Sequence, residues 1–163
     1  MKFINSKEIK IELTEEQQED LCSKETIKKI AEYDTVLTFD IYDGEKLIGF
    51  AQLHKFEEGQ YFLWNYAIDL KYQNKHYGTN ALKELIKFMI DNYNLKEITT
   101  TYIWGNEIAK HVYEKVGFIE TSVVDEDDVH EVNMSYEVKW WRILNYVILV
   151  AAQKCGLEYL CQI

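Results

Sequence analysis

A nearly continuous apolar run from Tyr61 to Asp69 is followed by a short polar loop and then by apolar residues at helical spacing. The run has the composition of a central strand that is covered on both faces of its sheet. Positions i, i+3, i+4, i+7 and i+8 of the next segment hold Leu82, Leu85, Ile86, Met89 and Ile90, the stripe of an amphipathic helix. The middle of the chain is therefore predicted to be a strand, a loop and a helix.

The residues before this strand, loop and helix have the patterns of another strand, a helical region and a hairpin. Residues Ile9 to Leu13 alternate apolar with polar, and Thr14 with Gln17 forms a capping box that starts a helical region, broken near Ser23. Two further apolar runs, 37–41 and 47–53, flank Asp43-Gly44, the pattern of a β-hairpin. A second turn at 57–60 leads into the central strand.

The residues after the central strand, loop and helix have the patterns of a strand, a helix and a pair of strands. Ile98 to Ile103 is rich in Thr and Ile, and Gly117 stands where the C-terminal cap of the following helix belongs. The runs 118–124 and 129–138 predict two strands. The inner side of the helix is predicted to hold Ile108, Ala109, Val112, Tyr113 and Val116.

Composition narrows the class of protein. A chain of 163 residues with a formal net charge of −10 fits one soluble domain without a nucleic-acid partner, because its Lys and Arg are not clustered. Three cysteines without a CxxC pair predict neither disulfides nor a metal site, and the start lacks the apolar run of a signal peptide, so a cytoplasmic location is expected. The apolar stretch 143–152 covers about half of a membrane span, so no membrane association is expected.

The loop between the central strand and its helix has the position of an anion site. Helix N-termini carry unpaired N–H groups and the positive end of the helix dipole, so they bind phosphate without basic side chains. Gly78 would let a pyrophosphate approach the backbone closely. The chain has no GxxxxGK[ST] or GxGxxG motif, which argues against nucleotide sites of those types.

Two segments resemble signatures of the GNAT N-acetyltransferase superfamily. Residues Gln73 to Gly78 resemble its [Q/R]xxGx[G/A] pyrophosphate loop, with His76 at the first Gly, and Asn106 to Phe118 are similar to NxxAxxLYEKxGF. The resemblance implies an α/β (α+β) GNAT fold: a mixed sheet of about seven strands, splayed between the fourth and fifth, with about four helices. It implies a GNAT domain at 1–138 and leaves 139–163 as an apolar extension that packs on the domain or against a second copy in a homodimer.

The resemblance also implies a site and a reaction. It implies an acetyl-CoA-dependent N-acetyltransferase that transfers acetyl to a primary amine within a ternary complex, releasing CoA, without a metal. Main chain at Ile68 would bind the pantetheine arm, Asn106 would hydrogen-bond the cofactor, and Tyr113 would protonate the leaving thiolate. The pyrophosphate would be held by main-chain amides of Gln73, Asn74, Lys75, His76, Tyr77, Gly78 and Thr79.

Several alternatives stay open. His76 either contacts a phosphate or only occupies a loop position with positive φ, and Trp64 stands where some polyamine-type members carry a glutamate base. Asp40 and Asp69 are interpreted as solvated carboxylates, and the chain could be an idle acyl-CoA-binding module or a structural protein. The acceptor is a small-molecule or protein amine, and the acidic residues 125–128 either attract a cationic acceptor or form a solvated turn.

Overall fold

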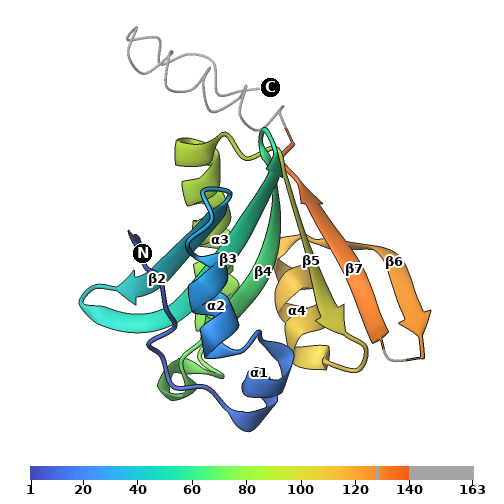
Figure 1. Cartoon of the computed structure of the whole chain (residues 1–163), viewed down its shortest axis with the longest axis horizontal. Helices are drawn as coiled ribbons and strands as arrows, with labels where there is room; N and C mark the ends of the chain where they lie inside the picture. Colours follow the sequence, from blue (N-terminus) through green and yellow to red (C-terminus); the bar gives the residue numbers. More distant parts are fainter. Residues whose placement is uncertain (128, 140–163) are drawn as a thin grey trace, which may run out of the picture.

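The computed structural model describes residues 1–127 and 129–139, which form one seven-stranded sheet in the order β1-β2-β3-β4-β5-β7-β6 (Figure 1). The strands are β1 (Lys2–Asn5), β2 (Val36–Asp43), β3 (Lys46–Glu57), β4 (Gln60–Ile68), β5 (Glu97–Ile103), β6 (Ile119–Glu126) and β7 (Val129–Glu137). The helices are α1 (Glu15–Asp20), α2 (Lys24–Ile30), α3 (Tyr77–Tyr93) and α4 (Glu107–Val116), with a 3₁₀ turn η1 (Leu70–Tyr72). This architecture confirms the predicted fold class.

The sheet opens between β4 and β5. These strands are parallel and pair only at three positions, from Gln60 with Glu97 to Phe62 with Thr99, whereas the other neighbours are antiparallel. Beyond the last pair the Thr100 hydroxyl still donates to the Leu63 carbonyl over 3.0 Å. The strands then diverge (Figure 1), so the predicted splay between the fourth and fifth strands is confirmed.

Helices cover both faces of the sheet. The buried stripe of α3, with Leu82, Leu85 and Met89, packs with Tyr113 of α4 in the larger core. On the opposite face Ile27 of α2 packs on Phe50 of β3 in a second cluster. Figure 1 shows α1 and α2 in front of the strands and α3 and α4 behind them. No helix among the described residues is long and apolar enough to cross a membrane.

The predicted strand at Ile9–Leu13 is wrong. The first strand is β1, which pairs antiparallel with β2, and residues 9–13 have no strand assignment. Ile9 and Ile11 are nevertheless buried in the second cluster, so the alternation reflects packing of an extended segment rather than strand pairing. The capping box of Thr14 and Gln17 is confirmed, and Ser23 caps a separate second helix.

Two other predictions of burial are wrong. Trp64 is 42% exposed and lies on the less buried face of β4 with Phe62 and Tyr66. The pairing of β3 with β4 steps from Asn65 to Leu63 at this point, so Trp64 is the extra residue of a bulge. Ile108, placed on the inner side of its helix, is 68% exposed in the first turn of α4. The remaining apolar positions of that helix are buried or half-buried.

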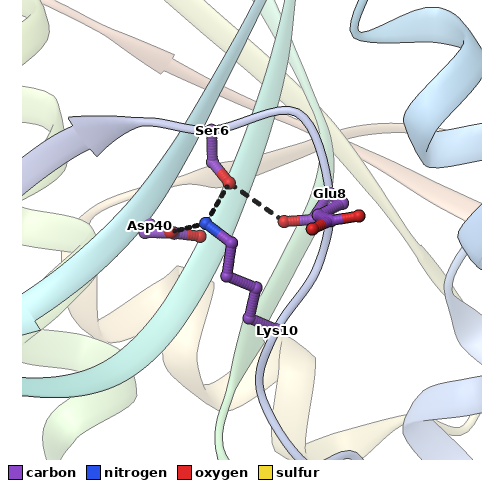
Figure 2. Close-up of polar contacts among 4 residues, drawn as sticks. All are labelled: Ser6, Glu8, Lys10 and Asp40. Atoms are coloured by element: carbon purple, nitrogen blue, oxygen red, sulfur yellow. Dashed lines mark hydrogen bonds and ion pairs between the residues drawn. The ribbon is translucent and has the colours of Figure 1, made fainter.

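Asp40 and Asp69 are both buried, which corrects the expectation of solvated carboxylates. The Lys10 ammonium lies 2.6 Å from Asp40, and Ser6 accepts a second hydrogen bond from Lys10 and donates to the Glu8 carbonyl (Figure 2). Asp69 accepts hydrogen bonds from the main-chain N–H groups of residues 12 and 71. Both carboxylates therefore fasten the segment before α1 to the sheet.

The apolar extension 139–163, with its predicted packing or dimer contact, lies outside the described residues except for Lys139. Asp128 of the acidic group is also outside them.

Candidate functional site

The main chain of Ile68 faces the splay. The Asp69 N–H donates to the Ile48 carbonyl over 2.9 Å, and Gly49 pairs with Ile68. In an antiparallel ladder this makes Gly49 and Ile68 a non-hydrogen-bonded pair, so the N–H and C=O of Ile68 point away from β3. The Ile68 carbonyl accepts from the side-chain amides of Gln17 and Gln73, at 3.1 and 3.2 Å. The Ile68 N–H is the group left directed into the splay.

The Gln73–Thr79 loop forms the entry to α3. Asn74 and His76 both have positive φ, 57° and 62°, and His76 is the N-cap residue of the helix without a capping side-chain hydrogen bond. The first N–H groups of the helix, Tyr77 to Thr79, have no intrahelical acceptors. The loop therefore presents unpaired donors at the positive end of a 17-residue helix.

His76 and Gly78 contribute differently to this loop. His76 has the left-handed backbone conformation, which His tolerates better than most residues. His at the position of the first Gly of the family's loop is therefore compatible with this loop. Gly78 does not have positive φ, and a Cβ there would meet Val112 and Ile68 at ordinary distances of 3.6 and 3.7 Å. The fold itself therefore does not require glycine at position 78.

The Tyr66 hydroxyl ties β4 to the start of α3. It donates to the Gly78 carbonyl over 2.6 Å. Burial is the main cause that raises the pKa of Tyr66 well above its usual range, with the nearby Tyr113 as a smaller cause. Sequence reasoning missed this residue, because a tyrosine in an apolar strand carries no sign of a distant hydrogen-bond partner.

Tyr113 lies close to the point where β4 and β5 separate. Its side chain is buried, with 8% exposed, and its ring packs on Phe118 with centroids 5.5 Å apart. Burial raises the pKa of the Tyr113 hydroxyl, the Thr100 side chain opposes this shift, and the charge of Asp20 adds to it. Thr100 also contacts β4 through its hydrogen bond to the Leu63 carbonyl, one residue beyond the last paired position. Tyr113 is thus a protonated phenol at neutral pH beside the splay.

Asn106 connects two helices. Its Oδ1 accepts from the Ala109 N–H over 2.9 Å as the N-cap of α4, and its Nδ2 donates to Asp20 Oδ2 over 2.6 Å. The motif alone predicts a cofactor contact at this residue and gives no indication of Asp20. The capping role could have been found, since Asn before a helix is a common cap.

The remaining predicted residues lie on the outside of the loop or away from it. Lys75 is exposed and donates to the Lys71 carbonyl, and Tyr77 donates to Asp43 over 3.2 Å. Asp125, in β6, contacts His130 at 2.6 Å, and with Trp104 these residues line an open depression of about 320 Å³. Within the described ranges no group of three His, Cys, Asp or Glu side chains is placed to hold a metal.

Comparison with known proteins gives matches at three levels. Residues 7–118 match the model of the acetyltransferase (GNAT) family. The chain is 33% identical over 84 residues to the spermine/spermidine N(1)-acetyltransferase of Bacillus subtilis (strain 168), covering 47% of this chain and 55% of that protein. A probable spermine N(1)-acetyltransferase of Bacillus subtilis subsp. natto (strain BEST195) matches with the same identity and coverage. The chain thus spans about half the length of the curated relatives it matches.

Solved structures share the fold. The spermidine N-acetyltransferase of Vibrio cholerae in complex with CoA and spermine has a TM-score of 0.59 at 19% identity, over 69% of this chain and 72% of that chain. An aminoglycoside acetyltransferase in complex with coenzyme A has a TM-score of 0.61 at 16% identity, over 76% and 81%. Because the family model covers most of the sequence, including both motifs up to Phe118, this chain belongs to the GNAT acetyltransferase family.

Proposed function

We propose that this protein is an N-acetyltransferase that moves the acetyl group of acetyl-CoA to a primary amine, with CoA as the second product. The observation that carries the proposal is the position of Tyr113, a buried phenol beside the splay. The Ile68 N–H points into the same splay, and α3 begins nearby without a side-chain cap. Family membership and the curated relatives, which act on spermine and spermidine, support a small amine as acceptor.

Each part of the site has a role in this proposal. The Ile68 N–H binds the pantetheine arm, and the amides from Gln73 to Thr79 bind the pyrophosphate. Asn106 Nδ2 has two protons, one of which is donated to Asp20, so the other is available to the cofactor. The Ile68 carbonyl is already occupied by Gln17 and Gln73, which leaves the N–H as the contact at this residue.

Tyr113 acts at the departure of the sulfur. Acetyl-CoA supplies the acetyl group as a thioester, and the neutral amine nitrogen bonds to its carbonyl carbon. As the C–S bond breaks, Tyr113 donates its O–H proton to the leaving sulfur and is reprotonated from solvent. The nitrogen loses one proton to solvent, and the products are an amide and CoA.

Binding of CoA tests the cofactor site directly. At a hundredfold excess over Kd, CoA is expected to stabilise the folded protein by about 2.7 kcal/mol, because it binds the native state alone. Calorimetric titration gives Kd, and thermal unfolding with and without CoA gives the shift in Tm. ATP serves as the control for binding by phosphate groups in general. An absence of CoA binding at millimolar concentration is incompatible with the proposed function.

The alternative function is an idle acyl-CoA-binding module, motivated by His76 and by Trp64 in place of a carboxylate. Both functions predict CoA binding, so they separate only in turnover. A screen of amines with acetyl-CoA, read as release of free thiol, distinguishes them: binding without thiol release from any amine supports the idle module. A homodimer through residues 139–163, a protein amine as acceptor and a cytoplasmic location stay predictions.

A further inference from the structure

Asp20 lies at the junction of α1 and α4. It is the last residue of α1, and its Oδ2 accepts from Asn106 Nδ2 over 2.6 Å. Asp20 is exposed, and Asn106 is half-buried. A carboxylate that is 86 positions from Asn106 in the sequence is thereby brought to the first turn of the helix that carries Tyr113.

The position of Asp20 is fixed from both sides. Gln17, one turn earlier in α1, donates its amide to the Ile68 carbonyl over 3.1 Å. Cys22, two residues later, donates its N–H to the buried Asn65 side chain over 3.1 Å. These contacts join α1 to β4 on one wall of the splay, and Asn106 joins Asp20 to α4. The carboxylate is thus held where α1, β4 and α4 meet.

Asp20 lies on the side of α4 that carries Tyr113. Asn106 and Tyr113 are seven residues apart, so they share one face of the helix, about 10 Å apart along its axis. A tyrosine in a helix points back toward the N-terminus, which brings its hydroxyl closer to Asn106. The charge of Asp20 contributes to the raised pKa of Tyr113, which agrees with this direction.

The charge of Asp20 is not neutralised within the described part of the chain. Asp40 contacts Lys10 and Glu120 contacts Lys110, whereas no Lys, Arg or His among the described residues lies within 4.0 Å of Asp20. Its partner Asn106 is a neutral amide that engages one oxygen, so Oδ1 is left to accept from a ligand. A fixed, uncompensated carboxylate beside an amine-acetylating centre suits an ammonium group.

We propose that Asp20 binds the second ammonium group of a diamine or polyamine acceptor, next to the nitrogen that is acetylated. The inference rests on the proposed function and names its substrate class. The attacking nitrogen must be neutral, whereas a nitrogen a few methylene groups away keeps its proton and its charge. Asp20 therefore selects acceptors that carry a second cation and places their free end near the thioester.

Asp20→Asn tests this role without disturbing the junction, because the amide oxygen of Asn still accepts from Asn106. For 1,3-diaminopropane and spermidine, kcat/KM is expected to fall about tenfold or more, the size of a lost hydrogen bond to a charged group. For propylamine, kcat/KM is expected to stay within about twofold, as is KM for acetyl-CoA, because neither depends on a second ammonium.

Glu19→Gln is the matched control. Glu19 precedes Asp20 in α1, is exposed and carries the same charge. Its neutralisation removes the same net charge, so a general attraction of cations would lower diamine turnover equally in both variants. We expect the Glu19→Gln protein to keep the wild-type preference for diamines. An equal loss in the two variants, or an Asp20→Asn protein that keeps the preference, would overturn the proposal.

Binding separates this inference from the proposed function. Spermidine is titrated into wild type, Asp20→Asn and Glu19→Gln by calorimetry, with and without CoA, so no turnover is needed. Weaker binding in Asp20→Asn alone supports the ammonium site even when no acetylation is observed, whereas equal affinities in all three proteins refute it. Failure of the proposed function appears separately, as absent CoA binding or absent thiol release in the wild type.

Discussion

Replacing Tyr113 with phenylalanine is expected to slow turnover by about 10²- to 10⁴-fold, the usual contribution of a positioned general acid. The ring keeps its packing against Phe118, so the fold and the affinity for CoA are expected to stay close to wild type. Because burial raises the pKa of Tyr113, the hydroxyl remains protonated across the neutral range and above it. Single-turnover kinetics with a saturating amine measure the chemical step.

Tyr66→Phe provides the control for Tyr113→Phe. It also removes one hydroxyl from a buried tyrosine near the splay, but that hydroxyl is committed to the Gly78 carbonyl. We expect a loss of about 1 kcal/mol in stability and a small change in turnover. Similar losses of single-turnover rate in the two variants, or an unchanged rate in Tyr113→Phe, would contradict the role of Tyr113.

Replacing Lys10 with methionine is expected to lower the free energy of unfolding by about 3 kcal/mol, since it leaves a buried carboxylate without its cation. The Asp40 side chain is 4% exposed, and its Oδ1 has no hydrogen-bond partner among the described residues. Lys10 is therefore its one ionic contact there, over 2.6 Å. Urea unfolding of the two proteins measures the difference.

Two variants test whether the loss comes from the buried charge. Lys7→Met breaks the ion pair between Lys7 and Glu32, whose two side chains are 66% and 58% exposed. It is expected to lower the free energy of unfolding by less than about 1 kcal/mol. The double variant Lys10→Met with Asp40→Asn removes the charge and is expected to recover part of the stability. A Lys10→Met protein as stable as Lys7→Met would show that the pair contributes little.

The pH dependence of this pair has a defined sign. The hydrogen bond to Asp40 raises the pKa of Lys10 above its ordinary value of 10.5. A group with a raised pKa in the folded state contributes its full stabilisation below the unfolded value and loses it as the pH passes the folded value. The difference between wild type and Lys10→Met is therefore expected to persist at neutral pH and to shrink in strongly alkaline solution.

Most of the fold could be predicted from periodicity, because the relevant patterns are local. The stripe of α3, the hairpin at Asp43-Gly44 and the cap at Gly117 each depend on neighbouring residues, and all three are present. The predicted first strand is wrong because Ile9 and Ile11 are buried between α2 and the face of the sheet, without strand pairing. The bulge at Trp64 cannot be recognised from the neighbouring residues, because it depends on the register between β3 and β4.

The site was less predictable, since its parts meet through contacts between distant segments. The motifs predict site residues at Gln73 to Thr79, Asn106 and Tyr113, and the structure brings the elements that carry them around the splay. Asp20, Tyr66 and Thr100 were missed, because their partners Asn106, Gly78 and Leu63 lie 86, 12 and 37 positions away. An aspartate at the end of a polar helix is indistinguishable by sequence from any solvated carboxylate.

The short pairing of β4 with β5 affects how freely this protein can diverge. Under the proposed function, the pantetheine arm takes the place of the strand contacts missing beyond Phe62, through main-chain groups that every amino acid supplies. Side chains on β4 are then not needed to bind the cofactor. The strand can therefore carry Trp64, in a bulge, at the position where some polyamine-type members of the family have a glutamate. Mutation can therefore alter the choice of acceptor along this strand while acetyl-CoA recognition is inherited unchanged.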